Sequence, residues 1–370
     1  MMTDTDKING PRACRAEELP ELLELVNHVF RTSQGRPPDI SDAYRHIYCE
    51  ENLELVRVIR VDGAIRASVG LFPFELAAGP HTFSALGLNC TTCHPDWRRR
   101  GLGALLMNDA ARLTQQRGLD FIHLAGGVPE WYRQLGYEQA GSRYLYHFDR
   151  GNIELLPRLD CEIATDLDRH IEQVHALYLA QRSGNMRSLH NTRQSFARYP
   201  GELLAAKQND ELKAYLYADF DNLVLECAGQ PAELIAGLTR ELFDQRDREN
   251  EGASTTGRDE KDKVLRNVLV SLEVSPLRTD LISLLNGLSI PCERNIWHMV
   301  RVTDPPALAD KISFEGTVEA AGEDAFAVTT DNGEQTMTRG AVGRLLFGPE
   351  QFPLRTQPPI PLFAPGTDHV

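Results

Sequence analysis

The hydrophobic pattern of the first 150 residues switches repeatedly between helical and strand-like spacing. Apolar residues three and four positions apart indicate amphipathic helices, and short β-branched or aromatic runs indicate strands. Asp62-Gly63 separates two such runs and is a typical hairpin turn. The predicted elements are helices at 14–31 and 41–48, strands at 53–61, 64–72 and 84–94, a helix at 101–117, a strand at 121–124, a helical turn at 129–135 and a strand at 144–148. This order predicts an α/β fold class, an α+β mixed sheet.

The pattern partly recurs between residues 150 and 290. The predicted elements are helices at 167–181 and 191–198, strands at 212–219 and 222–228, a helix at 231–243, a strand at 265–274 and a helix at 277–287. The order strand, strand, helix, strand, helix therefore occurs twice in the chain. Residues 245–263 are strongly polar and predict a mobile insertion.

The remaining residues predict a third, smaller unit. Strands are expected at 299–302 and in a hairpin within 317–330, and a helix at 339–347. Prolines between 358 and 365 predict an extended tail. A chain of 370 residues is too long for one small domain, and we predict domains at 1–149, 150–294 and 295–370.

Composition limits the classes of function. Acidic residues number 53 against 39 basic ones, and the net charge of −14 argues against nucleic-acid binding. The same charge makes a cationic small molecule plausible, although solubility alone explains it as well. No run approaches the roughly 18 apolar residues of a membrane span, and the N-terminus lacks a signal-peptide pattern. We expect a cytoplasmic protein with neither a membrane nor a nucleic-acid partner.

The seven cysteines are scattered, so a disulfide framework is not expected. Cys90 and Cys93 have the spacing of a redox or zinc pair, but no second pair accompanies them and they fall within a predicted strand. We therefore interpret them as structural thiols, and we expect no metal site.

A run of arginines leads into two glycines where a predicted strand gives way to a helix. Arg98 and Arg99 precede Gly101 and Gly103. A helix N-terminus offers free N–H groups and partial positive charge, so it can bind a pyrophosphate. Glycine lets the backbone approach phosphates closely, and arginine adds charge-assisted contacts. The alternative is a basic surface cluster before an ordinary helix, but the position directly after a strand favours ligand binding.

This arrangement resembles the acetyl-CoA-binding motif of the GNAT superfamily of N-acetyltransferases, matched by Arg98, Gly101 and Gly103. A second segment, from Trp131 to Tyr137, looks like that family's aromatic-Tyr-x-x-Leu/Phe-Gly-Phe/Tyr sequence. The resemblance implies acetyl-CoA as the acyl donor, bound at the strand end, the glycine turn and the exit of the next strand. The implied acetyl-CoA-binding residues are Thr91, Cys93, Arg98, Arg99, Gly101, Leu102, Gly103, Ala104 and Gly127.

Two GNAT-like units followed by a small third unit resemble the enhanced intracellular survival (Eis) acetyltransferases. The resemblance implies tandem GNAT-like domains, a sterol-carrier-like C-terminal domain and a homo-oligomer, although the third unit is shorter here. The second unit lacks the Arg-x-x-Gly-x-Gly pattern, so we expect it to bind no cofactor and to form the far wall of the acceptor cleft. Candidate acidic residues lining that cleft are Glu17, Glu18 and Glu21.

Tyr132 matches the position of the general acid in the GNAT family. A phenol with a pKa near 10 can protonate a departing thiolate whose pKa lies near 8.5. The alternative role for Tyr132 is aromatic packing, which is the role we assign to Tyr137.

The general base is less evident, because no Asp or Glu occurs between Ala85 and His94. In Eis-like enzymes the C-terminal carboxylate enters the active site, which implies Val370 as the base here. Desolvation would have to raise its pKa of roughly 3.5. The alternative to insertion is a frayed tail. Asp368 and His369 could assist the inserted terminus, and His94 is a second possible base.

The leading hypothesis is an N-acetyltransferase in which a small, cationic amine attacks acetyl-CoA directly in a ternary complex. A second hypothesis replaces the small acceptor by a protein or peptide amine. A third is a catalytically silent module that binds CoA or a lipid. The intact glycine motif and Tyr132 argue against the third.

Overall fold

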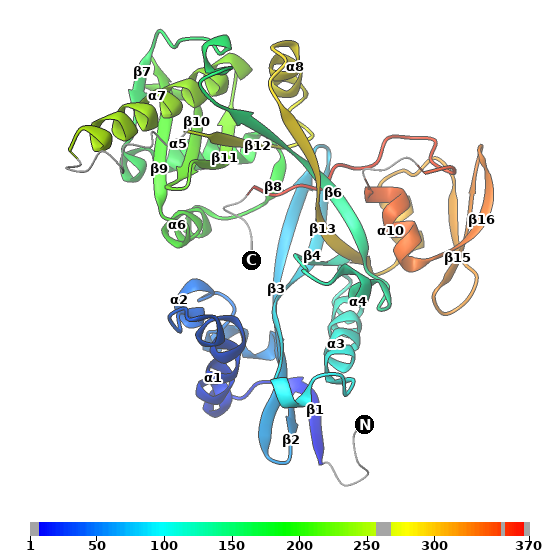
Figure 1. Cartoon of the computed structure of the whole chain (residues 1–370). Helices are drawn as coiled ribbons and strands as arrows, with labels where there is room; N and C mark the ends of the chain where they lie inside the picture. Colours follow the sequence, from blue (N-terminus) through cyan, green and yellow to red (C-terminus); the bar gives the residue numbers. More distant parts are fainter. Residues whose placement is uncertain (1–6, 257–267, 349–351, 366–370) are drawn as a thin grey trace.

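One large mixed β-sheet runs through the molecule (Figure 1). The computed structural model describes residues 7–256, 268–348 and 352–365. The strands are β1 (Ile8–Ala13), β2 (Val56–Val61), β3 (Ala64–Ala78), β4 (His81–Cys93), β5 (Phe121–Leu124), β6 (Glu138–Phe148), β7 (Glu162–Ala164), β8 (Ser183–Asn185), β9 (Gly201–Gln208), β10 (Glu211–Asp219), β11 (Leu223–Gly229), β12 (Val270–Val274), β13 (Cys292–Val302), β14 (Thr317–Ala320), β15 (Ala325–Thr330) and β16 (Gly333–Thr338). The helices are α1 (Leu19–Phe30), α2 (Ile40–Ala43), α3 (Leu102–Gln116), α4 (Pro129–Arg133), α5 (Leu167–Ala180), α6 (Leu189–Arg198), α7 (Ala232–Thr256), α8 (Thr279–Gly287), α9 (Pro305–Lys311) and α10 (Arg339–Phe347).

The order of strands in the large sheet is β1-β2-β3-β4-β5-β13-β6-β12-β11-β10-β9-β7, and β8 adds to β3. Most neighbours are antiparallel, but β4–β5 and β11–β12 are parallel. A second sheet, β14-β15-β16, packs with α9 and α10 at one side of the molecule (Figure 1). The predicted mixed α/β sheet is confirmed.

The N-terminal part of the sheet carries α1 on one face and α3 on the other (Figure 1). Leu22 and Val26 of α1 are buried, as the helical spacing predicts, and so are Leu106 and Ala110 of α3. The hairpin between β2 and β3 turns at Asp62-Gly63, where both residues have positive φ. A two-residue turn of this kind matches the twist of the strands that it joins.

The second half of the sheet is also covered on both faces. One hydrophobic core lies under α7 and α8, and another lies under α5 and α6. Antiparallel strands β10 and β11 precede α7, and β12 then runs parallel to β11. The repeated order of elements expected from the sequence is therefore present as a repeated topology.

Two strands connect the halves by crossing between them. Strand β6 follows the first unit in sequence, yet it pairs with β12 from Tyr144 to Phe148. Strand β13 follows the second unit, yet it lies between β5 and β6. The predicted boundaries, at residues 149/150 and 294/295, therefore fall beside or within crossing strands, and the two halves share one sheet.

Several elements differ from the sequence prediction. The expected helix at 41–48 is a single turn, α2. The segment 245–263 was expected to be a mobile insertion, but α7 continues to Thr256, and residues 257–267 lie outside the described part. Strands β1, β7, β9 and β16 and helix α9 were not predicted, because their short or alanine- and charge-rich sequences give weak periodicity.

Candidate active site

Strands β4 and β5 are paired over three positions only, ending at Gly87 and His123. Beyond this point β4 carries a bulge, because Ser68 pairs with Thr92 while Gly70 pairs with Asn89. The bulge places Cys90 at a φ of 47°. Strand β5 instead continues its pairing with β13 as far as Leu124. The two parallel strands thus part at their C-terminal ends, above the start of α3.

The arginine–glycine turn connects the end of β4 to α3. Gly101 precedes the helix with a φ of 86°, a conformation that glycine adopts without strain. The first hydrogen bond of the helix joins the N–H of Leu105 to the carbonyl of Gly101, at 3.1 Å. The amides of Leu102, Gly103 and Ala104 lie before this bond and have no intrahelical acceptor. These amides, at the positive end of a 15-residue helix, are suited to an oxyanion.

The arginines of this turn are oriented by local contacts. Arg98 donates from Nε to the carbonyl of Cys93 at 3.4 Å, which directs it towards the end of β4. Arg100 lies over the Trp97 ring at 4.4 Å from its centroid. Gly103 has a structural reason of its own, because a Cβ there would lie 3.1 Å from the Trp131 ring. Close packing against this ring, as well as ligand approach, therefore explains the second glycine.

Tyr132 lies in α4, close to the parted strands. Burial raises its pKa, and a hydrogen bond with the side chain of Thr91 acts in the opposite direction. The contact brings together two predicted site residues, from α4 and from the β4 bulge. Tyr132 also packs edge-on against Trp131 and Tyr137, with centroids 4.8 and 5.7 Å away. Tyr137 is fully buried in the core, as its predicted packing role requires.

The thiols of β4 are poor nucleophiles. Burial raises the pKa of Cys90 to about 11 and also raises the pKa of Cys93. A thiol with a raised pKa is protonated at neutral pH and is a weak nucleophile. Within residues 7–256, 268–348 and 352–365, no group of three or more metal-binding side chains occurs. In that same part of the chain, no helix is both long and apolar enough to cross a membrane.

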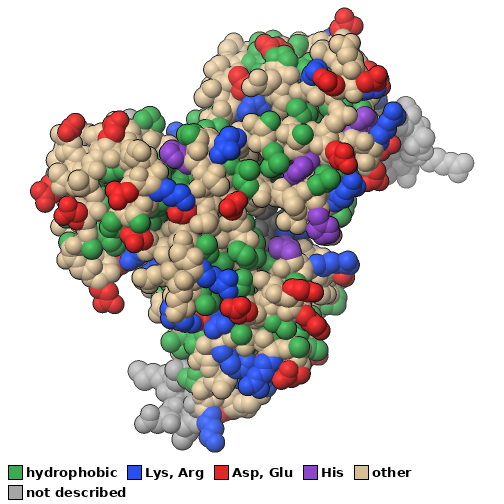
Figure 2. Space-filling model, turned by 180° about the vertical axis from the view of Figure 1, so that it is seen from behind, with side chains coloured by type: hydrophobic (Ala, Val, Ile, Leu, Met, Phe, Trp, Pro, Cys, Tyr) green, Lys and Arg blue, Asp and Glu red, His purple; other side chains and the backbone are tan. Residues whose placement is uncertain are grey.

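A cavity of about 1100 Å³ lies between the first and second units. Its walls include Phe72, Phe74 and His46 from the first unit, and His190 and Arg198 from the second. Figure 2 shows the hollow between the two units with histidine side chains around it. The cavity lies on the same face of β3 as α1 and α2, opposite to α3.

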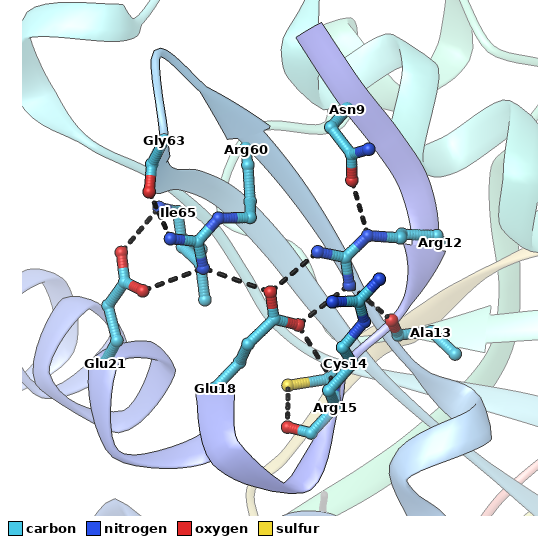
Figure 3. Close-up of polar contacts among 10 residues, drawn as sticks. All are labelled: Asn9, Arg12, Ala13, Cys14, Arg15, Glu18, Glu21, Arg60, Gly63 and Ile65. Carbon is cyan, nitrogen blue, oxygen red and sulfur yellow. Dashed lines mark hydrogen bonds and ion pairs between the residues drawn. The ribbon is translucent and has the colours of Figure 1, made fainter.

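The acidic residues expected in this cleft lie elsewhere. Glu18 is ion-paired with Arg12 at 2.6 Å and with Arg60 at 3.1 Å, and Glu21 also binds Arg60, at 2.8 Å (Figure 3). Together with Glu17, these carboxylates line a separate pocket of about 820 Å³ beside β1 and β2. The expectation that they attract an acceptor into the cleft is therefore wrong, because they stabilise the start of α1.

Two histidines that sequence reasoning missed are in contact beside the cleft. His298 of β13 contacts His123 of β5 through ring nitrogens, and both are buried. The His123 ring lies 5.6 Å from that of Phe74, which lines the cleft. The pairing of β5 with β13 creates this contact across 175 residues of sequence, so no local motif could have indicated it.

The tail passes between the units as an extended chain. Leu362, Phe363 and Ala364 are buried, so this part of the tail packs against the rest of the protein. A Cβ on Gly184 would lie 3.1 Å from Pro365, so the last described residue reaches β8, whose neighbours Met186 and Arg187 line the cleft. The predicted base, Val370, lies outside the described residues, as do Asp368 and His369.

The fold of the first unit, with its parted strands and glycine turn, is similar to that of GNAT-type acyltransferases. The family model described as an acetyltransferase (GNAT) domain matches residues 11–140, about the first third of the chain. These residues form a GNAT acetyltransferase domain, and the chain that contains it is an acyltransferase. The match spans the glycine turn and Tyr132. No curated protein matches the chain.

Solved structures extend the likeness in fold to almost the whole chain. A GCN5-related N-acetyltransferase from Anabaena variabilis is 14% identical, covers 98% of this chain and 95% of its own, and has a TM-score of 0.64. One from Kribbella flavida is 15% identical, covers 93% and 90%, and has a TM-score of 0.63. Eis1 from Mycobacterium abscessus is 16% identical, covers 93% and 90%, and has a TM-score of 0.64. At such identities the likeness shows a shared fold.

Proposed function

We propose that the protein is an acetyl-CoA-dependent N-acetyltransferase whose acceptor is a small-molecule amine. The observation that supports this most is the joint placement of parted strands, free helix amides and a buried tyrosine at one end of the first unit. The pyrophosphate of acetyl-CoA would bind to the turn formed by Arg98, Arg99, Gly101, Leu102, Gly103 and Ala104. The pantetheine arm would lie between β4 and β5, along the backbone of Thr91, Cys93 and Gly127.

Transfer would then proceed in one complex. The neutral amine attacks the carbonyl carbon of the thioester, a new C–N bond forms, and the C–S bond breaks with its electron pair left on sulfur. Tyr132, kept protonated by its raised pKa, donates a proton to that thiolate. The hydroxyl of Thr91 orients the phenol. The attacking nitrogen gives up its extra proton to a base, so the charges balance.

Two candidates for that base follow from the molecule. The first is the carboxylate of Val370, supported by the path of the tail to the cleft. The second is the pair His123–His298, whose ring nitrogens are in contact beside the cleft, since histidine commonly serves as a general base. Replacing His123 by Gln and, separately, deleting Val370 distinguishes them. The base is the group whose loss abolishes the fall of kcat at acidic pH. An unchanged dependence of kcat on pH in both variants contradicts both candidates.

The finer architecture is also part of the proposal. Residues 1–149 would be the catalytic domain, 150–294 a degenerate GNAT-like domain, and 295–370 a small sterol-carrier-like domain, assembled into a homo-oligomer. The likeness in fold to Eis1 over 93% of this chain supports this division. The net charge of −14 supports a cationic acceptor, whereas Glu18 and Glu21 do not, since they lie outside the cleft.

Measuring CoA release tests the function. The purified full chain is mixed with acetyl-CoA and with polyamines, aminoglycosides, amino acids or lysine peptides, and calorimetry measures acetyl-CoA binding. We expect binding, and release of CoA that depends on a small amine. Binding without turnover of any amine would favour a silent CoA-binding module, and turnover of peptides alone would favour the protein-acetylating alternative.

A further inference from the structure

Arg198 reaches into the cleft from the second unit. It is the last residue of α6, and its guanidinium lies 4.2 Å from the ring centroid of Tyr44 in the first unit and 5.0 Å from that of Tyr199. A guanidinium stacked on aromatic rings has its plane fixed, while its N–H edge stays able to bind an oxyanion through two hydrogen bonds. The stack therefore orients a cationic group at the cleft wall.

The charge of Arg198 affects the pKa of a residue in the β4 bulge. Burial is the main cause of the raised pKa of Cys90, and Arg198 and Arg31 both act against it. Desolvation lowers the pKa of His46, and the charge of Arg198 lowers it further. Cys90 precedes Thr91, which contacts Tyr132. Arg198 thus acts electrostatically on the part of β4 where the acetyl group would lie.

Other charged groups on this wall are already compensated. Asp42 is paired with Arg45 at 2.9 Å, and Arg187 is paired with the buried Glu226 at 2.8 Å. For Arg198, by contrast, the described residues provide no ion pair with a carboxylate. A positive group held beside a cavity without a partner of opposite charge favours an anionic ligand.

The acidic residues that line the cavity do not pair with Arg198. Asp42, Glu51 and Glu75 are the acids of its lining, and none forms an ion pair with Arg198 within the described residues. Glu75 lies on β3, five residues beyond Gly70, which pairs with Asn89 at the bulge. Glu51 accepts hydrogen bonds within its own loop, from Cys49 and its own backbone.

We propose that Arg198 binds an anionic group of the acceptor, a carboxylate or a phosphate, while the amine of the same molecule faces the thioester. This rests on the proposed function and narrows it, because the acceptor is then an amino acid or amino phosphate instead of a polycation. The second unit supplies specificity for the acceptor, and the first unit supplies the chemistry. Arg198 is in this sense a specificity-determining residue.

Matched pairs of acceptors test the proposal. Leucine, methionine and phenylalanine are compared with their amides, and phosphoethanolamine with ethanolamine, at fixed acetyl-CoA. We expect kcat/KM to be about 10- to 100-fold higher for the members that carry the anion, as for hydrogen bonds to a charged group. A preference confined to the amino acids identifies the group as a carboxylate, and one confined to phosphoethanolamine identifies it as a phosphate.

Substitution of Arg198 provides the control for a merely structural role. Arg198→Gln should abolish the preference and leave the KM for acetyl-CoA unchanged. Arg193→Gln, an exposed arginine on the same helix, should keep it. Equal rates for the pairs, or a preference that survives Arg198→Gln, would overturn the proposal while the acetyltransferase activity stands. If no amine turns over, calorimetry measures the binding of the same acceptor pairs to the protein. Equal affinity for both members of each pair, or no binding of either, would overturn the proposal for Arg198.

Discussion

The first and second units share one topology but differ where the central helix begins. In each, two antiparallel strands precede a helix, and a strand parallel to the second of them follows. Helix α3 begins after Gly101, with amides at its first turn that have no intrahelical acceptor. Helix α7 instead begins after Pro231, which is exposed, as is Glu233 in its first turn. The N–H of Leu234 bonds to the carbonyl of Pro231 at 3.1 Å.

The polar groups of the parallel strands differ, although both strands carry a bulge beyond their parallel pairing. Glu226 of β11 is completely buried and receives two 2.8 Å hydrogen bonds from Arg187 and a 2.5 Å bond from Tyr215. In β4 the corresponding region instead has a threonine that contacts Tyr132. A site that satisfies its own polar groups has none to offer a ligand. The comparison indicates that the helix start and the strand end, and not the topology, distinguish the unit proposed to bind acetyl-CoA.

Replacing Tyr132 by Phe should have the largest effect on catalysis. Loss of a general acid typically costs 10²- to 10⁴-fold in rate, so we expect kcat to fall by about 10³. Acetyl-CoA should still bind with the same affinity, because the turn at Gly101 is untouched. Stopped-time assays of CoA release and calorimetry measure the two quantities. Tyr144→Phe, at the junction with the second unit, is the control and should keep full activity; a Tyr132 variant with unchanged kcat excludes the acid role.

Replacing Glu226 by Gln should destabilise the second unit strongly. The change leaves the buried Arg187 guanidinium without its counter-charge, which costs about 3–5 kcal/mol of the free energy of unfolding. Denaturant unfolding measures the loss. Glu211→Gln breaks the exposed pair with Lys213 and should cost about 1 kcal/mol or less. Below the melting temperature the KM for acetyl-CoA should not change; a changed KM would mean that the second unit contributes to cofactor binding.

Matched glycine substitutions separate the two helix starts. Gly101 and Gly229 both have positive φ, which costs an alanine about 1–2 kcal/mol. No atom lies within 4 Å of a Cβ at Gly101, so the turn can shift, and we expect a KM for acetyl-CoA about 5- to 30-fold higher. At Gly229 a Cβ would collide with the backbone of β10, so Gly229→Ala should lower the melting temperature and leave KM unchanged. The reverse pattern would contradict the comparison.

The local elements of the first unit could be predicted because their signals are short-range. The hairpin at Asp62-Gly63, the strand β5 and the helix α3 follow from periodicity and turn residues. The crossing of β6 and β13 between the units could not be predicted. A strand pattern specifies which face of the strand is buried but not which neighbouring strand it pairs with. The helical continuation of α7 was missed because a polar composition was interpreted as a loop, although an exposed helix end tolerates polar residues.

In the candidate site, too, the residues close together in sequence could be predicted and the distant ones could not. Sequence placed Thr91, Cys93, the glycine turn and Tyr132 in one region, because a strand, a turn and a helix bring them together within 42 residues. The residues that distant segments contribute to the site could not be predicted from the sequence. His298 lies on β13, which crosses between the units, and Arg198 lies on a helix of the second unit. Neither residue therefore belongs to a local sequence motif. The expected role of Glu18 failed because helix periodicity cannot identify partners such as Arg12 and Arg60.

That ion-pair cluster gives the smallest of the expected effects, and one confined to the first unit. The hydrogen bond from Arg12 lowers the pKa of Glu18 to about 2, from an ordinary value of 4.5. A lowered pKa in the folded state stabilises it fully above about pH 4.5, and this stabilisation is lost as pH falls towards 2. Because Arg12 and Arg60 are partly exposed, solvent screening limits the effect to about 1 kcal/mol.

The variant Glu18→Gln should therefore be less stable than the unmodified chain near neutral pH, and the difference should vanish on acidification. Denaturant unfolding between pH 3 and pH 7 measures it, with the exposed Glu17→Gln as a control that should show no such trend. Since Glu18 accepts hydrogen bonds from Arg12, Arg60 and the backbone of Arg15, its loss acts on the start of α1 and not on the cleft. The KM values for acetyl-CoA and for the amine should stay constant. A rise in the KM for the amine would mean that Glu18 takes part in acceptor binding, which would contradict its placement outside the cleft.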